Sequence, residues 1–251
     1  MIGRRPLLLG FGAALATPRM LGASAPAQGA VDLVLNGAWR QGGYALGRTE
    51  PRALILVDGE ALSTASTDGL FIVGFDRDAP ALAEIEVRSG ARSTRRVLDV
   101  APYAFPSTRV DGLPPATVEP SDPALLDRIR QEVALKTEAF ASRADADDFR
   151  DGFIWPLETY RISSEWGAQR ILNGTPARPH YGVDLAAPAG TVIRAPADGR
   201  IVFTRPDMHF EGGLTLIDHG QGLISAYLHQ SQLDVTPNQP AGAAIPWAAS
   251  A

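Results

Sequence analysis

The chain has 251 residues, 45% of them apolar, which is enough for the core of one large domain or two small ones. Its formal net charge is −5 with both signs dispersed, so it lacks the basic patch of a nucleic-acid-binding protein. The absence of cysteine excludes a disulfide framework and thiolate chemistry. Abundant glycine and proline with few aromatic residues favour many short strands over long helices.

The first 30 residues have the pattern of a secretory signal peptide. Arg4 and Arg5 precede an apolar run from Pro6 to Ala16, and small residues follow up to Ala30. The apolar run is too short to span a bilayer. The arginine pair resembles a twin-arginine signal, an ordinary Sec signal fits nearly as well, and a disordered or anchored N-terminus is the alternative. We therefore predict a signal peptide at 1–30, export to the periplasm and no membrane span in the mature chain.

Residues 31–105 predict a β-sandwich-like module. Short strand-forming runs are separated by turn residues; the runs are VDLVL, RALILVDG, LFIVGFD and AEIEVRSGARSTRRVLDV. The segment contains no cluster of residues that would carry chemistry, so a spacer or docking role is expected.

Residues 106–151 predict a proline-rich linker followed by a helix. Prolines are frequent up to Pro123, which favours extended chain. Ser121 or Asp122 is a suitable N-cap, and Leu125 and Ile129 begin an apolar stripe at helical spacing. The helix is expected to bridge two β-rich units.

Residues 152–251 return to strand-forming sequence. The runs are TYRISSEWG, GTVIRAPADGRIVFTRP, GGLTLIDHG and GLISAYLHQ. The predicted fold class is therefore mainly β, with an N-terminal β-sandwich-like module, a linking helix and a C-terminal antiparallel β domain.

His180 and Asp184 are the first candidate site residues. Pro179 and Gly182 disfavour a helix through them, and in an extended strand residues four apart lie on the same face. An imidazole and a carboxylate on one face begin a zinc site, although a catalytic zinc typically has three protein ligands. Taken alone, the spacing is equally consistent with a surface histidine near an aspartate.

The remaining histidines lie in or beside the later strands. In GLISAYLHQ, strand alternation puts Ser225, Tyr227 and His229 on one face, where His229 could handle protons in a cleft or simply lie at the surface. His219 is expected at a strand end with a structural hydrogen bond. His209 is expected in a loop, without a function or facing substrate.

In combination, these motifs resemble the lysostaphin/LytM-type zinc endopeptidases, which cut peptidoglycan. The segments RISSEWGAQR, HYGVDLAAPAGTVIRAPADGRIV and GGLTLIDHGQGLISAYLHQSQLDV occur in the family's order and spacing, over roughly residues 152–235. The N-terminal β module, linker and helix also look like exported members of the family.

The resemblance implies a zinc metalloendopeptidase with His180 and Asp184 as zinc ligands and His229 as a catalytic residue. It implies peptidoglycan peptides as substrates, bound in a shallow groove. Arg170, Asn173 and Tyr181 are candidates for lining this groove, while closing a turn is an equally good account of Arg170 and Asn173.

The sequence departs from the family after His229. The family's third zinc ligand comes from a later His-x-His strand, and no histidine follows His229 here. The tail TPNQPAGAAIPWAASA shows no strand alternation, so an unpaired sheet edge is expected. We expect an incomplete peptidase domain, as in a truncated or frame-shifted form of an active enzyme.

Three functions follow from these observations. The first is a peptidoglycan zinc endopeptidase, with the activity of this chain dependent on the missing ligand. The second is a non-catalytic wall-binding protein or an activator of a partner hydrolase. The third, a carbohydrate-binding or scaffold protein, explains the β-rich sequence but not the ordered motifs.

Overall fold

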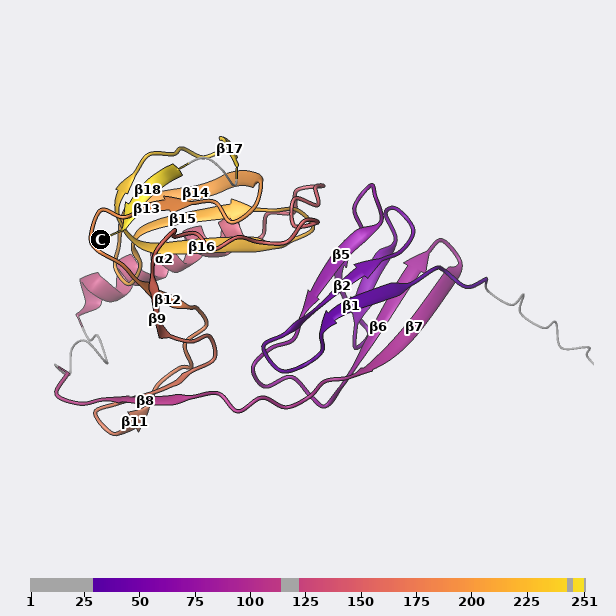
Figure 1. Cartoon of the computed structure of the whole chain (residues 1–251), viewed down its shortest axis with the longest axis horizontal. Helices are drawn as coiled ribbons and strands as arrows, with labels where there is room; N and C mark the ends of the chain where they lie inside the picture. The colour runs from indigo at the N-terminus through magenta and orange to yellow at the C-terminus, as the bar shows by residue number, and fades with distance from the viewer. Residues whose placement is uncertain (1–28, 114–121, 243–245, 251) are drawn as a thin grey trace, which may run out of the picture.

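The computed structural model describes residues 29–113, 122–242 and 246–250. These residues form a mainly β structure with a single long helix, which confirms the predicted fold class (Figure 1). The predicted signal peptide lies almost wholly outside the described residues. No helix among the described residues has the length and hydropathy needed to cross a bilayer.

The N-terminal module contains two antiparallel sheets. One has the order β1-β2-β5 and the other the order β4-β3-β6-β7. The strands are β1 (Val34–Ala38), β2 (Tyr44–Arg48), β3 (Leu54–Val57), β4 (Glu60–Thr64), β5 (Leu70–Gly74), β6 (Leu82–Ser89) and β7 (Arg92–Asp99). Residues from both sheets form one core that includes Ile55, Phe71 and Ile85, each fully buried.

Gly47 is required where β2 crosses the ring of Phe71. A Cβ at Gly47 would lie 2.0 Å from the nearest ring carbon, whereas a Cβ at Gly74 on β5 would meet nothing within 4 Å. We expect Gly47→Ala to lower the free energy of unfolding by about 1–3 kcal/mol through overpacking. The matched control Gly74→Ala should be neutral or stabilising by up to about 1 kcal/mol. Urea unfolding of both variants checks this, and equal midpoints would contradict it.

The segment predicted as linker and helix contains a strand as well. The strand β8 (Ser107–Val110) pairs in parallel with β10 (Gln169–Leu172), which also pairs with β11 (Thr175–Pro176). The helix α2 (Pro123–Phe140) begins at the N-cap Asp122, whose side chain accepts a hydrogen bond from the backbone of Ala124 at 2.9 Å. The segment is extended at β8, as predicted, but there it is paired in a sheet and is not a free linker; the predicted helix and its cap at Asp122 are present.

A six-stranded antiparallel sheet forms the centre of the C-terminal unit. Its order is β13-β18-β16-β15-β14-β17. The strands are β13 (Val192–Arg194), β14 (Gly199–Met208), β15 (Gly212–Asp218), β16 (Ile224–Leu233), β17 (Pro240–Ala241) and β18 (Pro246–Ser250). The prediction of a strand-free tail was wrong, because β18 pairs with both β13 and β16 and so covers the edge of β16.

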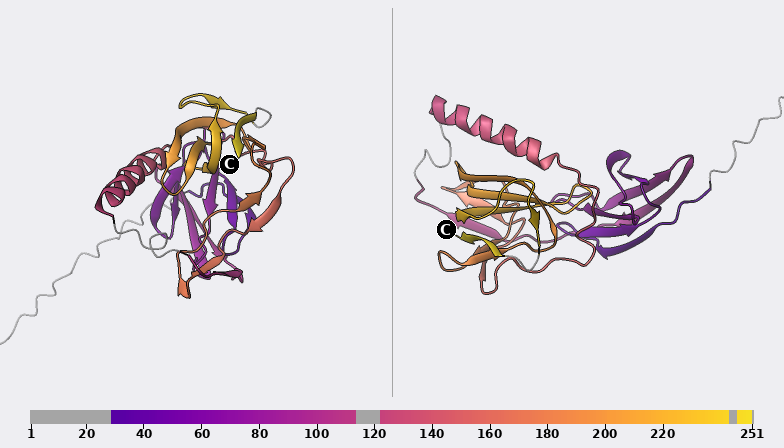
Figure 2. Two further views of the ribbon diagram at one scale, coloured as in Figure 1. Left: turned by 90° about the vertical axis from the view of Figure 1, so that its left-hand side faces the viewer. Right: turned by 90° about the horizontal axis from the view of Figure 1, so that it is seen from above.

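The two faces of this sheet pack against different parts of the chain. Leu214 and Leu216 of β15 face the side on which Ala139 of α2 packs. Ile217 faces the other side, where it packs with Leu185 and the segment that precedes β9 (Arg161–Ser164). Figure 2 shows α2 running along one side of the sheet. The small sheet of β9 and β12 (Asp184–Ala186) therefore lies away from the helix.

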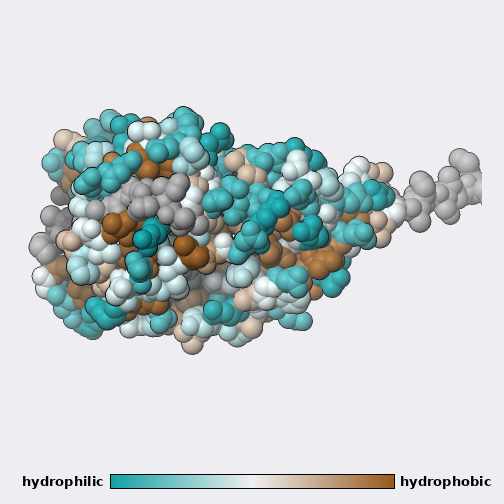
Figure 3. Space-filling model, turned by 45° about the horizontal axis from the view of Figure 1, so that its top comes forward, coloured by the Kyte–Doolittle hydropathy of each residue, from teal (hydrophilic) through white to brown (hydrophobic). Residues whose placement is uncertain are grey.

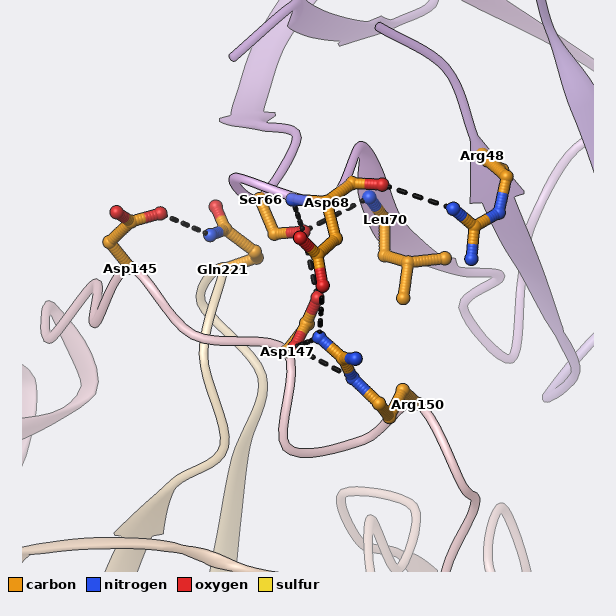
Figure 4. Close-up of polar contacts among 8 residues, drawn as sticks. All are labelled: Arg48, Ser66, Asp68, Leu70, Asp145, Asp147, Arg150 and Gln221. Atoms are coloured by element: carbon orange, nitrogen blue, oxygen red, sulfur yellow. Dashed lines mark hydrogen bonds and ion pairs between the residues drawn. The ribbon is translucent and has the colours of Figure 1, made fainter. Parts of the chain in front are cut away.

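Polar contacts hold the N-terminal module against the loop after α2 (Figure 4). The hydroxyl of Ser66 donates to the carboxylate of Asp147 at 2.9 Å, and Arg150 bridges Asp147 and Asp68. Arg52 and Asp145 form a further ion pair at 2.6 Å. On the face shown in Figure 3, apolar residues form separate groups among hydrophilic ones.

Candidate functional site

His180 lies in a loop just before β12 rather than in a strand. Its backbone N–H donates to the carbonyl of Ala168 at 2.9 Å, and its carbonyl accepts from Gly167 at 2.7 Å. The imidazole Nδ1 lies 3.0 Å from the hydroxyl of Ser164, at the end of β9. These contacts fix both the position and the ring orientation of His180. The prediction of one extended strand through His180 and Asp184 was therefore wrong. A loop, and not strand alternation, places His180 close to Asp184.

Asp184, the first residue of β12, faces the His180 ring. Its Oδ1 lies 3.1 Å from His180 Nε2, and its Oδ2 accepts a hydrogen bond from Arg170 at 2.9 Å. A carboxylate only accepts, so the contact with Nε2 needs a positive centre between the two atoms. That centre is either a proton on Nε2 or a metal ion. The side chain of Asp184 is 42% exposed, so the site is open to solvent.

The donor chemistry and spacing of this pair fit zinc. Two ligands of a tetrahedral zinc, each about 2.1 Å from the metal, lie about 3.4 Å apart, close to the observed 3.1 Å. Ser164 on the second ring nitrogen and Arg170 on the second carboxylate oxygen are contacts of the kind that orient metal ligands. The described residues contain no group of three His, Cys, Asp or Glu side chains placed for a metal. A third ligand is therefore not among them.

His229 does not share a face with Tyr227, contrary to the prediction. Tyr227 pairs with Thr215 and Gln230 pairs with Gly213, so β16 has one extra residue at this point. His229 lies in this bulge with a φ of 58°, and its backbone N–H donates to Glu211 at 2.7 Å. Its side chain is exposed, while the next residue, Gln230, is buried. The bulge breaks the alternation on which the prediction depended.

The groove candidates lie in three different surroundings. Arg170 of β10 belongs to the site through Asp184. Asn173 has a φ of 48° in the turn between β10 and β11, and its side-chain amide both donates to and accepts from the backbone of Leu113. Its contacts are those of a residue that closes a turn. Tyr181 is 43% exposed beside His180, with its ring edge-on to Trp166.

His219 is structural, as predicted from its place at the end of β15. It is fully buried, with Nδ1 at 2.6 Å from the carbonyl of Asp198 and Nε2 at 2.7 Å from the hydroxyl of Ser225. Burial lowers the pKa of His219, outweighing the carbonyl of Asp198 and the nearby carboxylates, which act to raise it. His209 lies at the exposed tip between β14 and β15, where its backbone N–H donates to Glu132 at 2.9 Å.

Residues 178–244 match the model of Peptidase family M23, and this range includes both His180 and Asp184. This segment is a peptidase family M23 domain. The finding confirms the family predicted from the sequence motifs.

Curated relatives of the M23 domain have different activities. The peptidoglycan DD-endopeptidase ShyA of Vibrio cholerae is 34% identical over 87 residues, which cover 34% of this chain and 20% of that protein. The murein hydrolase activator NlpD of Escherichia coli is 32% identical over 84 residues, which cover 34% of this chain and 22% of that protein. The matches thus span about a fifth of each relative.

One solved structure resembles most of the chain. A Pseudomonas aeruginosa protein assigned to peptidase M23 aligns with a TM-score of 0.63 and 25% identity, over 84% of this chain and 82% of that one. Since the M23 domain is a minor part of the sequence, this likeness extends to the N-terminal module as well.

Sequence reasoning missed Ser164 as a partner of the site, and it named Arg170 only as a groove candidate and not as a partner of Asp184. Ser164, which contacts the His180 ring, is the last residue of β9, and Arg170 follows six residues later. Both residues lie within the RISSEWGAQR segment, which is one of the segments that resemble the family. That resemblance was the sequence feature that could have pointed to them. Their roles depend on how the β9–β10 connection folds back on His180.

Proposed function

We propose that the M23 domain is a zinc-dependent endopeptidase that acts on peptidoglycan peptides, in a protein exported to the periplasm. The observation that carries the proposal is the 3.1 Å approach of His180 Nε2 to Asp184 Oδ1. It is supported by the family of residues 178–244 and by a relative that bears the name of a peptidoglycan endopeptidase. The N-terminal sequence supports export.

The chain's own residues have defined parts in this proposal. His180 and Asp184 supply two zinc ligands, and Ser164 holds the His180 ring. Arg170 donates to Oδ2 of Asp184, which leaves Oδ1 free to bind the metal. The ion pair with Arg170 is therefore compatible with zinc binding through a single carboxylate oxygen. When bound, zinc supplies an activated water and polarises a carbonyl. The proposal requires a third ligand from outside the described residues or from another molecule.

A non-catalytic role is the second candidate. It is favoured by the lack of a three-ligand cluster among the described residues and by the likeness to a murein hydrolase activator. In that case the domain would bind wall peptides or a partner hydrolase without cutting.

Digestion of purified sacculi by the full chain separates the two candidates. With added zinc, the wild type is expected to release soluble fragments and new amino groups, and His180→Ala is expected to reduce this release on the order of a thousandfold. His209→Ala, an exposed histidine away from the site, should behave as the wild type. Sedimentation of the protein with sacculi, unchanged by a chelator and without any release, would overturn the enzyme proposal in favour of the second candidate.

A further inference from the structure

A small pocket lies where the N-terminal module meets the β9–β10 connection. Its volume is about 170 Å³, and it is lined by residues of both units, including Arg40, Gln41, Tyr103, Phe105, Glu165 and Trp166. The volume corresponds to roughly five or six waters, well below the roughly 300 Å³ or more of a pocket for a drug-sized ligand. The pocket therefore suits one small chemical group of a larger ligand.

Three aromatic rings line the pocket. The ring centroids of Tyr103 and Phe105 lie 4.9 Å apart, and those of Phe105 and Trp166 lie 5.6 Å apart, both in edge-to-face contact. Tyr103 is 40% exposed, but two of the rings already have a guanidinium beside them: that of Arg40 lies 4.3 Å from the Tyr103 centroid, and that of Arg77 lies 5.1 Å from the Phe105 centroid. Aromatic faces carry negative potential and attract cations, and here they position the side chains of Arg40 and Arg77 beside the pocket.

Two opposite charges line the same pocket without pairing. The guanidinium of Arg40 lies 4.3 Å from the centre of the Tyr103 ring. Within the described part of the chain, neither Arg40 nor Glu165 forms an ion pair, although both line the pocket. A cation and an anion that line one small space without pairing are complementary to a ligand that carries both charges.

Hydrogen bonds hold the backbone next to the pocket, which adjoins the candidate metal site. Arg77 of the N-terminal module donates to the carbonyl of Gly167 at 2.8 Å, and Gly167 N–H donates to the carbonyl of His180 at 2.7 Å. A Cβ at Gly42 would lie 2.6 Å from the Trp166 ring, so the two units meet closely here. Glu165 directly follows Ser164, the residue that contacts the His180 ring.

We propose that this pocket binds a zwitterionic amino-acid head group, an ammonium and a carboxylate on one carbon. Arg40, which lies over the Tyr103 ring, binds the carboxylate, and Glu165 binds the ammonium. As a substrate subsite, it would hold the free end of a diamino acid in a wall peptide while the peptide extends to His180. That assignment rests on the proposed function, whereas the pocket's preference for a zwitterion does not.

Titration calorimetry of the full chain with diaminopimelate tests the proposal. Wild type is expected to bind diaminopimelate, and Glu165→Gln and Arg40→Gln should each weaken binding at least about tenfold. Glu158→Gln, an exposed glutamate outside the pocket, is the matched control and should bind as the wild type. Pimelate, which lacks the ammonium groups, and cadaverine, which lacks the carboxylates, should bind at least about tenfold more weakly.

Absence of diaminopimelate binding by folded wild type would overturn the proposal. Equal binding of pimelate, cadaverine or N-acetylglucosamine, or binding unaffected by Glu165→Gln, would overturn it as well. His180→Ala should retain diaminopimelate binding. Wild type that binds diaminopimelate but does not digest sacculi would therefore count against the proposed enzyme, and wild type that digests sacculi but does not bind diaminopimelate would count against the pocket.

Discussion

Replacing His219 with alanine is expected to lower the free energy of unfolding by about 3–4 kcal/mol. The ring is fully buried and joins the carbonyl of Asp198 to the hydroxyl of Ser225. It also packs edge-on against Phe153, with centroids 5.3 Å apart. Its removal leaves a cavity and takes away both hydrogen bonds of the ring. His209→Ala, at an exposed hairpin tip, is the control and should change stability little.

The pH dependence of stability provides an independent readout for His219. Burial lowers its pKa, so the folded state holds the ring neutral while the unfolded chain takes up a proton near the ordinary value of about 6.5. The unfolded state then binds more protons, and this part of the stability is lost as pH falls below about 6.5 toward the lower folded-state pKa. The His219→Ala variant should lack this decline. Parallel urea-unfolding profiles of wild type and variant from pH 7.5 downward would contradict the assignment.

Replacing Asp147 with alanine should have the second largest effect, a loss of about 2–3 kcal/mol. Asp147 is buried and accepts from Ser66 of the N-terminal module and from Arg150 of its own loop. Its loss leaves the Ser66 hydroxyl without its carboxylate partner and weakens the contact between the two units. Asp127→Ala on the exposed surface of α2 is the control. Urea unfolding measures both, and equal midpoints would refute the expectation.

Acid should weaken the same contact. Burial acts to raise the pKa of Asp147, but hydrogen bonds from Arg150 and Ser66 outweigh it, and the pKa ends below its usual range. The carboxylate therefore stabilises the folded state above the unfolded pKa of about 3.9, and this stabilisation is lost as pH falls through the lower folded-state value. In Asp147→Ala the corresponding acid-side decline should be absent.

Local sequence patterns predicted the strongly periodic elements and missed the irregular ones. The long runs of β6 and β7 and the Asp122 cap of α2 were predictable, because alternation and capping are local signals. The strand β2 was missed because Gly47 weakens its pattern, and that glycine is explained only by the ring of Phe71 across the sheet. Likewise β8 and β18 are defined by their partners β10 and β16.

The candidate site was predictable in part for the same reason. The meeting of His180 and Asp184 follows from their proximity in sequence and from the family motifs, although a loop rather than a strand brings them together. The displacement of His229 depends on one extra residue in β16, which alternation cannot reveal. The pocket with Arg40 and Glu165 joins residues more than a hundred positions apart, and only the docking of the two units places them together.

Zinc titration of the full chain by calorimetry tests the central claim most directly. The account predicts zinc binding that His180→Ala abolishes and that Ser164→Ala weakens about 10- to 100-fold through loss of the contact that orients the ring. His209→Ala should bind zinc as the wild type does. Zinc uptake that is the same in wild type and His180→Ala, or no uptake by the folded wild type, would contradict the claim that His180 and Asp184 form a metal site.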